Sequence, residues 1–140
     1  MGLKDSSGEM DYFVAVRHLT RQRPDWPLLV RYEHMPVDAL RAGGVLAGAN
    51  LSPRLFVEFY QAAMAGCRER VDQIQQTLAI RRALYSVGTG ALAAVAGIKC
   101  ALSLRGIADD FIAEPFESPR AEQRSQIDRI LHESGLGRVV

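Results

Sequence analysis

The sequence has almost no net charge, no long apolar run and no sign of a secretory leader. Its 17 lysines and arginines nearly balance its 16 aspartates and glutamates, so the net charge is +1. The two signs are interspersed, which argues against a basic surface for nucleic acid or for an acidic membrane. No apolar stretch approaches the roughly 20 residues that a helix needs to span a bilayer. The N-terminus lacks a charged region followed by an apolar one. We therefore expect a cytoplasmic protein with neither a nucleic-acid nor a membrane partner.

Cysteine and histidine are also scarce. Cys67 and Cys100 stand alone, without the C-x-x-C spacing of a zinc or redox site. Two isolated cysteines suit a reducing compartment, where thiols stay free. His18, His34 and His132 are scattered along the chain, and we expect each to be a surface or structural residue. The sequence therefore predicts no metal site and no cofactor.

Lysine is the rarest of the basic residues. Lys4 and Lys99 are the two lysines among 17 basic residues, and arginine supplies the other positive charges. Arginine stays protonated in proteins, whereas a lysine amine can lose its proton and react. Lys99 lies in an apolar segment, from which it is expected to extend its ammonium to the edge of a helix. Lys4 is therefore the candidate for amine chemistry.

The first fifty residues alternate short apolar segments with helical ones. The segments at 2–4, 28–32 and 44–48 are brief and apolar, which is typical of buried parallel strands. Helical patterns at 9–21 and 35–43 separate them. Before the first of these helices, a serine and a glutamate have the S-x-x-E spacing of a capping box, at Ser6 and Glu9. This order predicts an α/β fold in which helices cover parallel strands.

The rest of the chain is predicted to be helical. Ser52 and Pro53 have the pattern of an N-cap followed by a first helical residue. Glycines at 66, 106 and 135 are expected to end three helices. Further helices are expected at 67–85, at 91–104 and from Ser118 onward. The residues expected to face inward are Leu55, Phe56, Phe59, Ala62 and Ala63, then Val71, Ile74, Leu78, Leu84 and Tyr85, and finally Ile127, Ile130 and Leu131.

Lys4 ends a strand candidate, and the C-terminal ends of parallel strands are where barrel enzymes place catalytic groups. A neutral lysine amine can condense with a 2-oxo acid, and the resulting imine withdraws electrons from the adjacent carbon. The alternative is a solvated lysine near a chain end. The segment "DSSG" that follows also allows two interpretations, a ligand site or a helix cap, because capping explains these residues without any ligand.

In their order along the chain, four segments resemble those of a known family. "GLKDSSGEMDYF" resembles the lysine-containing segment of the dihydrodipicolinate synthase / N-acetylneuraminate lyase family. "DALRAGGVLAGANLSPRLFVEFYQAAMAGCRERVDQIQ", "AGIKCALSLRGI" and "AEPFESPRAEQRSQIDRILHESGL" are similar to three later runs of that family. The resemblance covers essentially the whole chain, and the segments occur in the family's order.

The resemblance implies the fold of the C-terminal part of a (β/α)8 barrel. Residues 2–4, 28–32 and 44–47 would be its sixth, seventh and eighth strands. Residues 1–66 would form the partial barrel, and residues 67–140 would form a C-terminal helical extension.

The resemblance also implies the chemistry. Lys4 would form the Schiff base with pyruvate or a related 2-oxo acid, as in class I aldolases and lyases. The backbone at Leu46 would lie near the substrate carboxylate. Arg31 stands where family members usually have glycine, and three roles stay open for it: it could crowd the pocket, favour the neutral form of the Lys4 amine, or bind a substrate acid.

The family's carboxylate-binding segment and catalytic tyrosine come from earlier strands, which this sequence does not include. We therefore expect little or no lyase activity from the chain alone. Two kinds of partner are expected to complete it, either copies of the chain in a homo-oligomer or a complementary half-barrel. The alternative is a half-barrel interaction module, or an inactive relic, that performs no catalysis.

Overall fold

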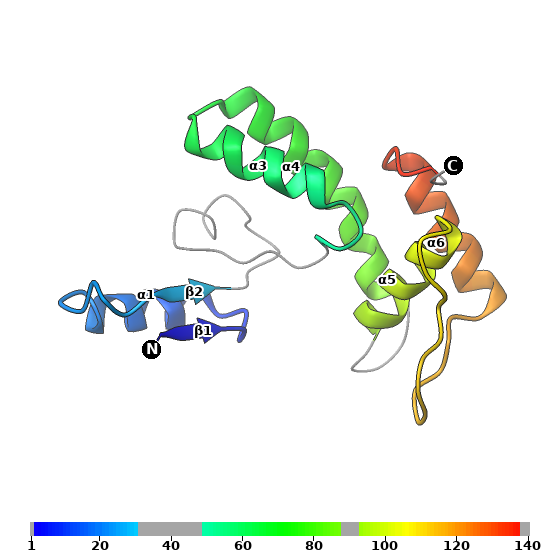
Figure 1. The fold of residues 1–140 in the computed structure, drawn as a ribbon, viewed down its shortest axis with the longest axis horizontal. Coiled ribbons are helices and arrows are strands. Elements are labelled where there is room, and N and C mark those ends of the chain that lie inside the picture. Colours follow the sequence, from blue (N-terminus) through cyan, green and yellow to red (C-terminus); the bar gives the residue numbers. More distant parts are fainter. Residues whose placement is uncertain (1, 31–48, 88–92, 138–140) are drawn as a thin grey trace. The chain divides into compact units, whose positions relative to one another are not determined.

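A computed structural model describes residues 2–30, 49–87 and 93–137 of the chain (Figure 1). These residues are mostly helical and include a small parallel sheet. The chain divides into two compact units, Met1–Val71 and Asp72–Val140, and each is described by itself. The expected division at residue 66 into a partial barrel and a helical extension stays a prediction. Within the described ranges, no helix has the length and apolar character to cross a bilayer.

The first unit opens with a strand, a helix and a second strand. Strand β1 is Leu3–Asp5, helix α1 is Met10–Leu19 and strand β2 is Leu28–Val30. The two strands pair in parallel, with Leu3 opposite Leu28, Lys4 opposite Leu29 and Asp5 opposite Val30. The prediction of parallel strands joined by a helix is confirmed for these two strands. The third predicted strand, at 44–48, and the predicted helix at 35–43 lie outside the described residues.

The start of α1 differs from the predicted capping box. The N-cap is Glu9, and no side chain caps the helix there. The carboxylate Oδ1 of Asp5 instead accepts a hydrogen bond from the Ser7 backbone N–H at 2.8 Å, and the Ser7 hydroxyl accepts one from the Glu9 N–H at 3.1 Å. Short polar side chains readily make such local bonds in place of a helix cap. Ser6 is therefore left to bond elsewhere.

Helix α3, Pro53–Met64, begins as predicted. Ser52 is its N-cap and Pro53 its first residue, although the Ser52 hydroxyl is buried and makes no hydrogen bond within the described part of the chain. Phe59 and Ala62 are buried, which confirms part of the predicted inward face. Helix α4, Arg68–Arg82, follows after a short turn. An ion pair between Arg70 and Glu58 links α4 to α3, with Nη2 and Oε1 2.6 Å apart.

The second unit contains the end of α4, a 3-10 helix η1 at Ala83–Ser86, helix α5 at Ala93–Leu104 and helix α6 at Ala121–Glu133. The sequence predicted one continuous helix over 67–85, so its tightening into η1 was not expected. Helix α5 packs against both η1 and α6. The buried apolar residues of this unit are Ile74, Leu84, Val87, Ala96, Cys100, Ala101, Ile127, Ile130 and Leu131.

The ends of α6 show one wrong expectation and one correct one. The helix begins at Ala121 rather than at Ser118, and the side-chain oxygen of Gln123 accepts the backbone N–H of Arg120 at 2.8 Å. The N-cap is Arg120, whose backbone is extended, so Ser118 and Pro119 both precede the helix. The helix ends as predicted at Gly135, whose φ of +71° is a left-handed conformation suited to glycine. The Leu136 N–H then donates to the Leu131 carbonyl at 2.8 Å.

Gly97 is a point of close backbone contact in the second unit. A Cβ added there would lie 2.0 Å from the carbonyl oxygen of Leu84 in η1. Helix α5 therefore approaches η1 backbone to backbone, and any side chain at residue 97 would push the two apart.

Gly97→Ala is expected to lower the free energy of unfolding by about 1–3 kcal/mol, the usual cost of overpacking a core. Helix propensity alone favours alanine by about 1 kcal/mol, so a loss of stability identifies the clash. Urea unfolding followed by circular dichroism measures the change. Gly137→Ala is the matched control, because a Cβ at Gly137 meets no atom within 4 Å. Equal stability of the two variants would contradict the close approach.

Candidate active site

Lys4 is the middle residue of β1, and its side chain is exposed. Side chains alternate between the two faces of a strand, so Leu3 and Asp5 point to the opposite face from Lys4. Leu3 is half-buried there and Asp5 is buried. The Lys4 Nζ donates a hydrogen bond to the Ser6 hydroxyl at 2.8 Å. Lys4 therefore projects its amine from the open face of the sheet, beside its β2 neighbour Leu29.

The carboxylate next in sequence does not pair with this amine. Asp5 is 6% exposed and lies on the other face, where its Oδ1 holds the turn into α1. Its Oδ2 is buried and has no hydrogen-bond partner in the described part of the molecule. Among the described residues, the Lys4 amine therefore bonds to the Ser6 hydroxyl and not to the carboxylate next to it in sequence.

The other two predicted site residues are not placed by the structure. Arg31 and Leu46 both fall within residues 31–48, outside the described residues. The structure therefore neither brings them to Lys4 nor separates them from it, and their roles stay predictions.

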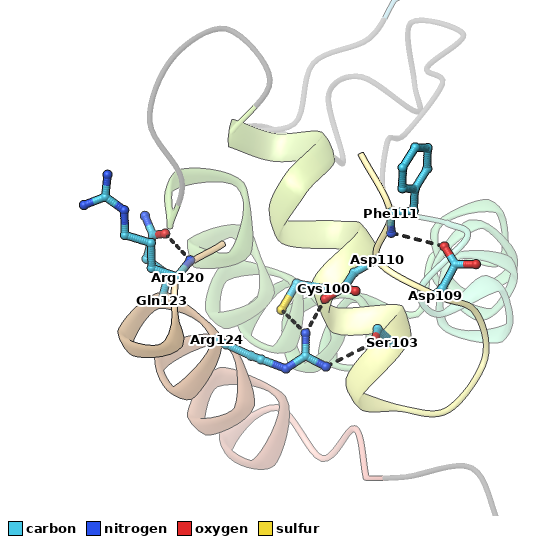
Figure 2. A network of polar contacts seen from close by, with 8 residues as sticks. All are labelled: Cys100, Ser103, Asp109, Asp110, Phe111, Arg120, Gln123 and Arg124. Carbon is cyan, nitrogen blue, oxygen red and sulfur yellow. Dashed lines mark hydrogen bonds and ion pairs between the residues drawn. The ribbon is translucent and has the colours of Figure 1, made fainter. Parts of the chain in front are cut away.

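A second polar cluster lies in the C-terminal unit, and the sequence reading missed it (Figure 2). Arg124 of α6 forms an ion pair with Asp110 and donates a hydrogen bond to the Ser103 hydroxyl at 3.1 Å. The same guanidinium lies 3.8 Å from the Cys100 sulfur. Arg124 lies three residues before the buried Ile127, on the same face of α6. A cation on the inward face of a helix is the sequence signal that could have indicated this cluster.

This cluster joins α5 and α6 to the connector between them. Lys99 Nζ donates to the Phe111 carbonyl at 2.5 Å, and the Phe111 N–H donates to Asp109 Oδ1 at 3.1 Å. Lys99 was expected to extend its ammonium to the edge of its helix, and the Phe111 carbonyl is the group that it bonds there. These bonds connect α5, α6 and the segment between them, which is a structural role.

Arg81 is a second cation that the sequence reading missed. It is 9% exposed, and its Nη2 donates to the Ser134 carbonyl at the end of α6, 3.0 Å away. Burial, and secondarily the charge of Arg105, lower the pKa of Arg81 below its ordinary value. A positive charge at a helix C-terminus is favourable, so Arg81 stabilises the end of α6.

The described residues offer no alternative catalytic or metal centre of comparable chemistry. No group of three or more potential metal ligands occurs among them. A groove of about 590 Å³ in the second unit is lined by residues such as Leu104, Arg105 and His132. The basic side chains along it have protein partners. Arg105 donates to the Gly137 carbonyl, Arg124 pairs with Asp110, and the His132 Nε2 lies 3.8 Å from an Asp128 oxygen. Lys4 is the residue on which a chemical proposal can rest.

Comparison with known proteins identifies the family. The sequence model of the dihydrodipicolinate synthetase family matches residues 1–134. The chain belongs to this family, which confirms the resemblance found in the sequence.

Two relatives show the extent of the similarity. The chain is 29% identical over 140 residues to a 4-hydroxy-tetrahydrodipicolinate synthase from Methanopyrus kandleri, covering 97% of the chain and 44% of that protein. It is 30% identical over 138 residues to an uncharacterized DapA-like lyase of Halobacterium salinarum, covering 96% of the chain and 43% of that protein. The chain therefore spans less than half the length of these relatives.

Solved structures agree on the fold. The dihydrodipicolinate synthase of Bacteroides thetaiotaomicron superposes with a TM-score of 0.85 at 35% identity, covering 95% of the chain and 46% of that structure. YagE, a prophage protein of Escherichia coli K12 solved in complex with pyruvate, gives a TM-score of 0.81 at 20% identity over 97% of the chain and 46% of that structure. The chain thus has the fold of part of a barrel enzyme of this family.

The two thiols are expected to differ sharply in reactivity. Both cysteines are free; Cys67 is exposed and Cys100 is buried. Burial raises the pKa of the Cys100 thiol, while Arg124 acts in the opposite direction. A higher pKa leaves less of the reactive thiolate at a given pH.

At pH 8, dithionitrobenzoate should therefore modify one thiol of the folded chain quickly and the second only after unfolding. Cys67→Ser should abolish the fast phase and leave the slow one unchanged. Two equally fast thiols in the folded chain would show that Cys100 is accessible and its core is open.

Proposed function

We propose that Lys4 forms a Schiff base with pyruvate or a related 2-oxo acid, as part of a class I lyase or aldolase of the dihydrodipicolinate synthase family. In this proposal β1 and β2 are the sixth and seventh strands of a (β/α)8 barrel, residues 44–47 form the eighth, and the chain is the C-terminal portion. The observation that carries it is the position of Lys4. In a chain of this family, its amine extends from the open face near the C-terminal end of a parallel strand.

The step is a condensation of the Lys4 amine with the keto group of the acid. The Lys4 ammonium first gives up a proton, and the neutral nitrogen attacks the carbonyl carbon to give a carbinolamine. The carbonyl oxygen then leaves as water with one amine hydrogen and one returned proton, and the nitrogen keeps one hydrogen and the positive charge. The iminium then draws electrons from the neighbouring carbon, which permits a carbon–carbon bond to form or break there. Ser6 orients the Lys4 amine, because its hydroxyl accepts a hydrogen bond from Nζ.

The chain alone is expected to show little lyase activity. It covers 43–46% of the compared relatives, so most of a complete barrel's surface around the substrate lies outside it. Imine chemistry needs positioned proton donors and a clamp for the carboxylate, and without them most of the transition-state stabilisation is lost. Imine formation is the step that Lys4 itself supplies, and it is therefore the step to test.

Borohydride reduction in the presence of pyruvate is expected to attach one pyruvate-derived group to Lys4. Pyruvate is the natural probe because it occupies the structure of YagE, which shares the fold. Lys4, Lys99 and the N-terminal amine are the primary amines of the sequence, so peptide mass spectrometry assigns the adduct without ambiguity. Lys4→Arg should remove it. Lys99→Arg is the matched control and should keep it.

The trapping experiment also tests the alternative function, an interaction module that performs no catalysis. A folded chain without an adduct, or with adducts distributed equally over Lys4 and Lys99, would favour an interaction module that performs no catalysis. Circular dichroism of the same sample confirms that the protein is folded.

For the two residues outside the described part, we propose that Arg31 and the backbone at Leu46 line the 2-oxo acid pocket. Arg31→Gly distinguishes two of the roles left open for the arginine, binding of the substrate acid and crowding of the pocket. If Arg31 binds the substrate carboxylate, the variant should need about tenfold more pyruvate for half-maximal trapping, which corresponds to the loss of one charged hydrogen bond. If Arg31 crowds the pocket, trapping should improve. An unchanged concentration dependence would place Arg31 outside the pocket.

A further inference from the structure

Leu29 is the residue of β2 that lies directly beside Lys4. The parallel register pairs Lys4 with Leu29, and residues paired in this way direct their side chains to the same face of the sheet. Neighbouring strands lie about 4.8 Å apart, so the two side chains extend from adjacent points of that face. Their adjacency follows from the register of β1 and β2 alone.

The neighbours of Lys4 along β1 differ from its neighbour across the strand pair. Two residues before Lys4, the Pro27 ring takes the place of a side chain at Gly2, because a Cβ added there would lie 2.7 Å from the Pro27 Cγ. Two residues after Lys4, the Ser6 hydroxyl accepts the hydrogen bond from Nζ at 2.8 Å. The amine therefore has a hydroxyl next to it along the strand and the aliphatic side chain of Leu29 beside it on β2.

We infer that Leu29 contacts the third carbon of the 2-oxo acid bound to Lys4, and that it thereby selects acids with a small apolar group at that carbon. The inference rests on the proposed function, because it takes the imine at Lys4 as given. It adds a residue that determines which 2-oxo acid the site accepts.

The lengths of the two side chains support this contact. Side chains of a strand stand roughly perpendicular to the sheet. Lysine is longer than leucine, so a group bonded to Nζ lies above the level of the Leu29 methyl groups. The third carbon of the acid is two bonds away from Nζ in the imine, which keeps it within reach of a side chain on the adjacent strand.

The chemistry of leucine gives the direction of the selection. Leucine offers no hydrogen bond, so a hydroxyl or carboxylate placed against it loses its water without a replacement. A methyl group has no such cost. A longer apolar group would have to displace the branched Leu29 side chain, so the contact favours a methyl group over an ethyl group at this position.

The test compares two acids as labels for Lys4. The chain is reduced with borohydride over a series of pyruvate or 2-oxobutyrate concentrations, and mass spectrometry gives the concentration of each acid that labels half of Lys4. 2-Oxobutyrate has one methylene more than pyruvate. The unsubstituted chain should need at least about tenfold more 2-oxobutyrate than pyruvate, which is the usual effect of one methylene in an apolar pocket.

Two leucines of β2 provide matched variants. Leu29→Ala makes room for the extra methylene and should reduce the ratio of the two concentrations to about threefold or less. Leu28→Ala makes the same truncation one residue earlier, at a half-buried side chain on the opposite face, and should leave the ratio unchanged. A loss of folding would raise both concentrations together, so the ratio reports contact with the acid.

A third variant tests polarity. Leu29→Asn places an amide of similar size beside the amine. It should improve labelling by 3-hydroxypyruvate relative to pyruvate about fivefold, the effect of one neutral hydrogen bond to the added hydroxyl.

The outcomes separate this inference from the proposed function. A folded chain that forms no Lys4 adduct with any of the acids would reject both. An adduct with the same ratio in the unsubstituted chain and in Leu29→Ala would retain the Schiff base and overturn the role of Leu29, as would a ratio near one in the unsubstituted chain. An equal change in Leu28→Ala would also overturn it, because the effect would then come from packing of the sheet.

Discussion

The parallel pairing of β1 with β2 is the constraint on which the candidate site depends. Because side chains alternate along a strand, this pairing sends the Lys4 amine to the open face and the Asp5 carboxylate to the buried one. Two adjacent residues of opposite charge are thereby prevented from neutralising each other. Asp5 is used to build the turn into α1, and the amine is left with a neutral hydroxyl at Ser6. The geometry that holds the lysine in place also keeps its amine apart from the nearest acid.

The C-terminal unit is stabilised by different means and contains none of the proposed chemistry. Its core depends on the backbone approach at Gly97, which allows η1 and α5 to meet without an intervening side chain. Arg124 of α6 bonds to Asp110 in the connector and to Ser103 in α5. Arg81 of α4 donates a hydrogen bond to the Ser134 carbonyl at the end of α6. These groups bind one another. Within the described residues, the unit has the construction of a self-contained helical support.

Much of the fold could be predicted from the sequence because the relevant signals are local. A serine followed by proline fixed the start of α3, and Gly135 marked the end of α6. The wrong predictions concern residues for which several local hydrogen bonds compete, or residues whose partners lie far away in the sequence. Ser6 lost the capping role because Asp5 and Ser7 make closer bonds in the same turn. The burial of Arg81 could not be foreseen, since its acceptor at Ser134 lies 53 residues further along the chain.

The residue proposed to react could be singled out from the sequence for a different reason. Scarcity of lysine singled out Lys4, and the family resemblance gave it a role, but neither describes its surroundings. The structure adds that the Lys4 side chain is exposed and that its amine donates a hydrogen bond to the Ser6 hydroxyl. An amine that must condense with a 2-oxo acid needs a site from which bulk water is excluded. Lys4 is exposed among the described residues, so in the proposed function its amine must be enclosed by parts of the barrel that lie outside them.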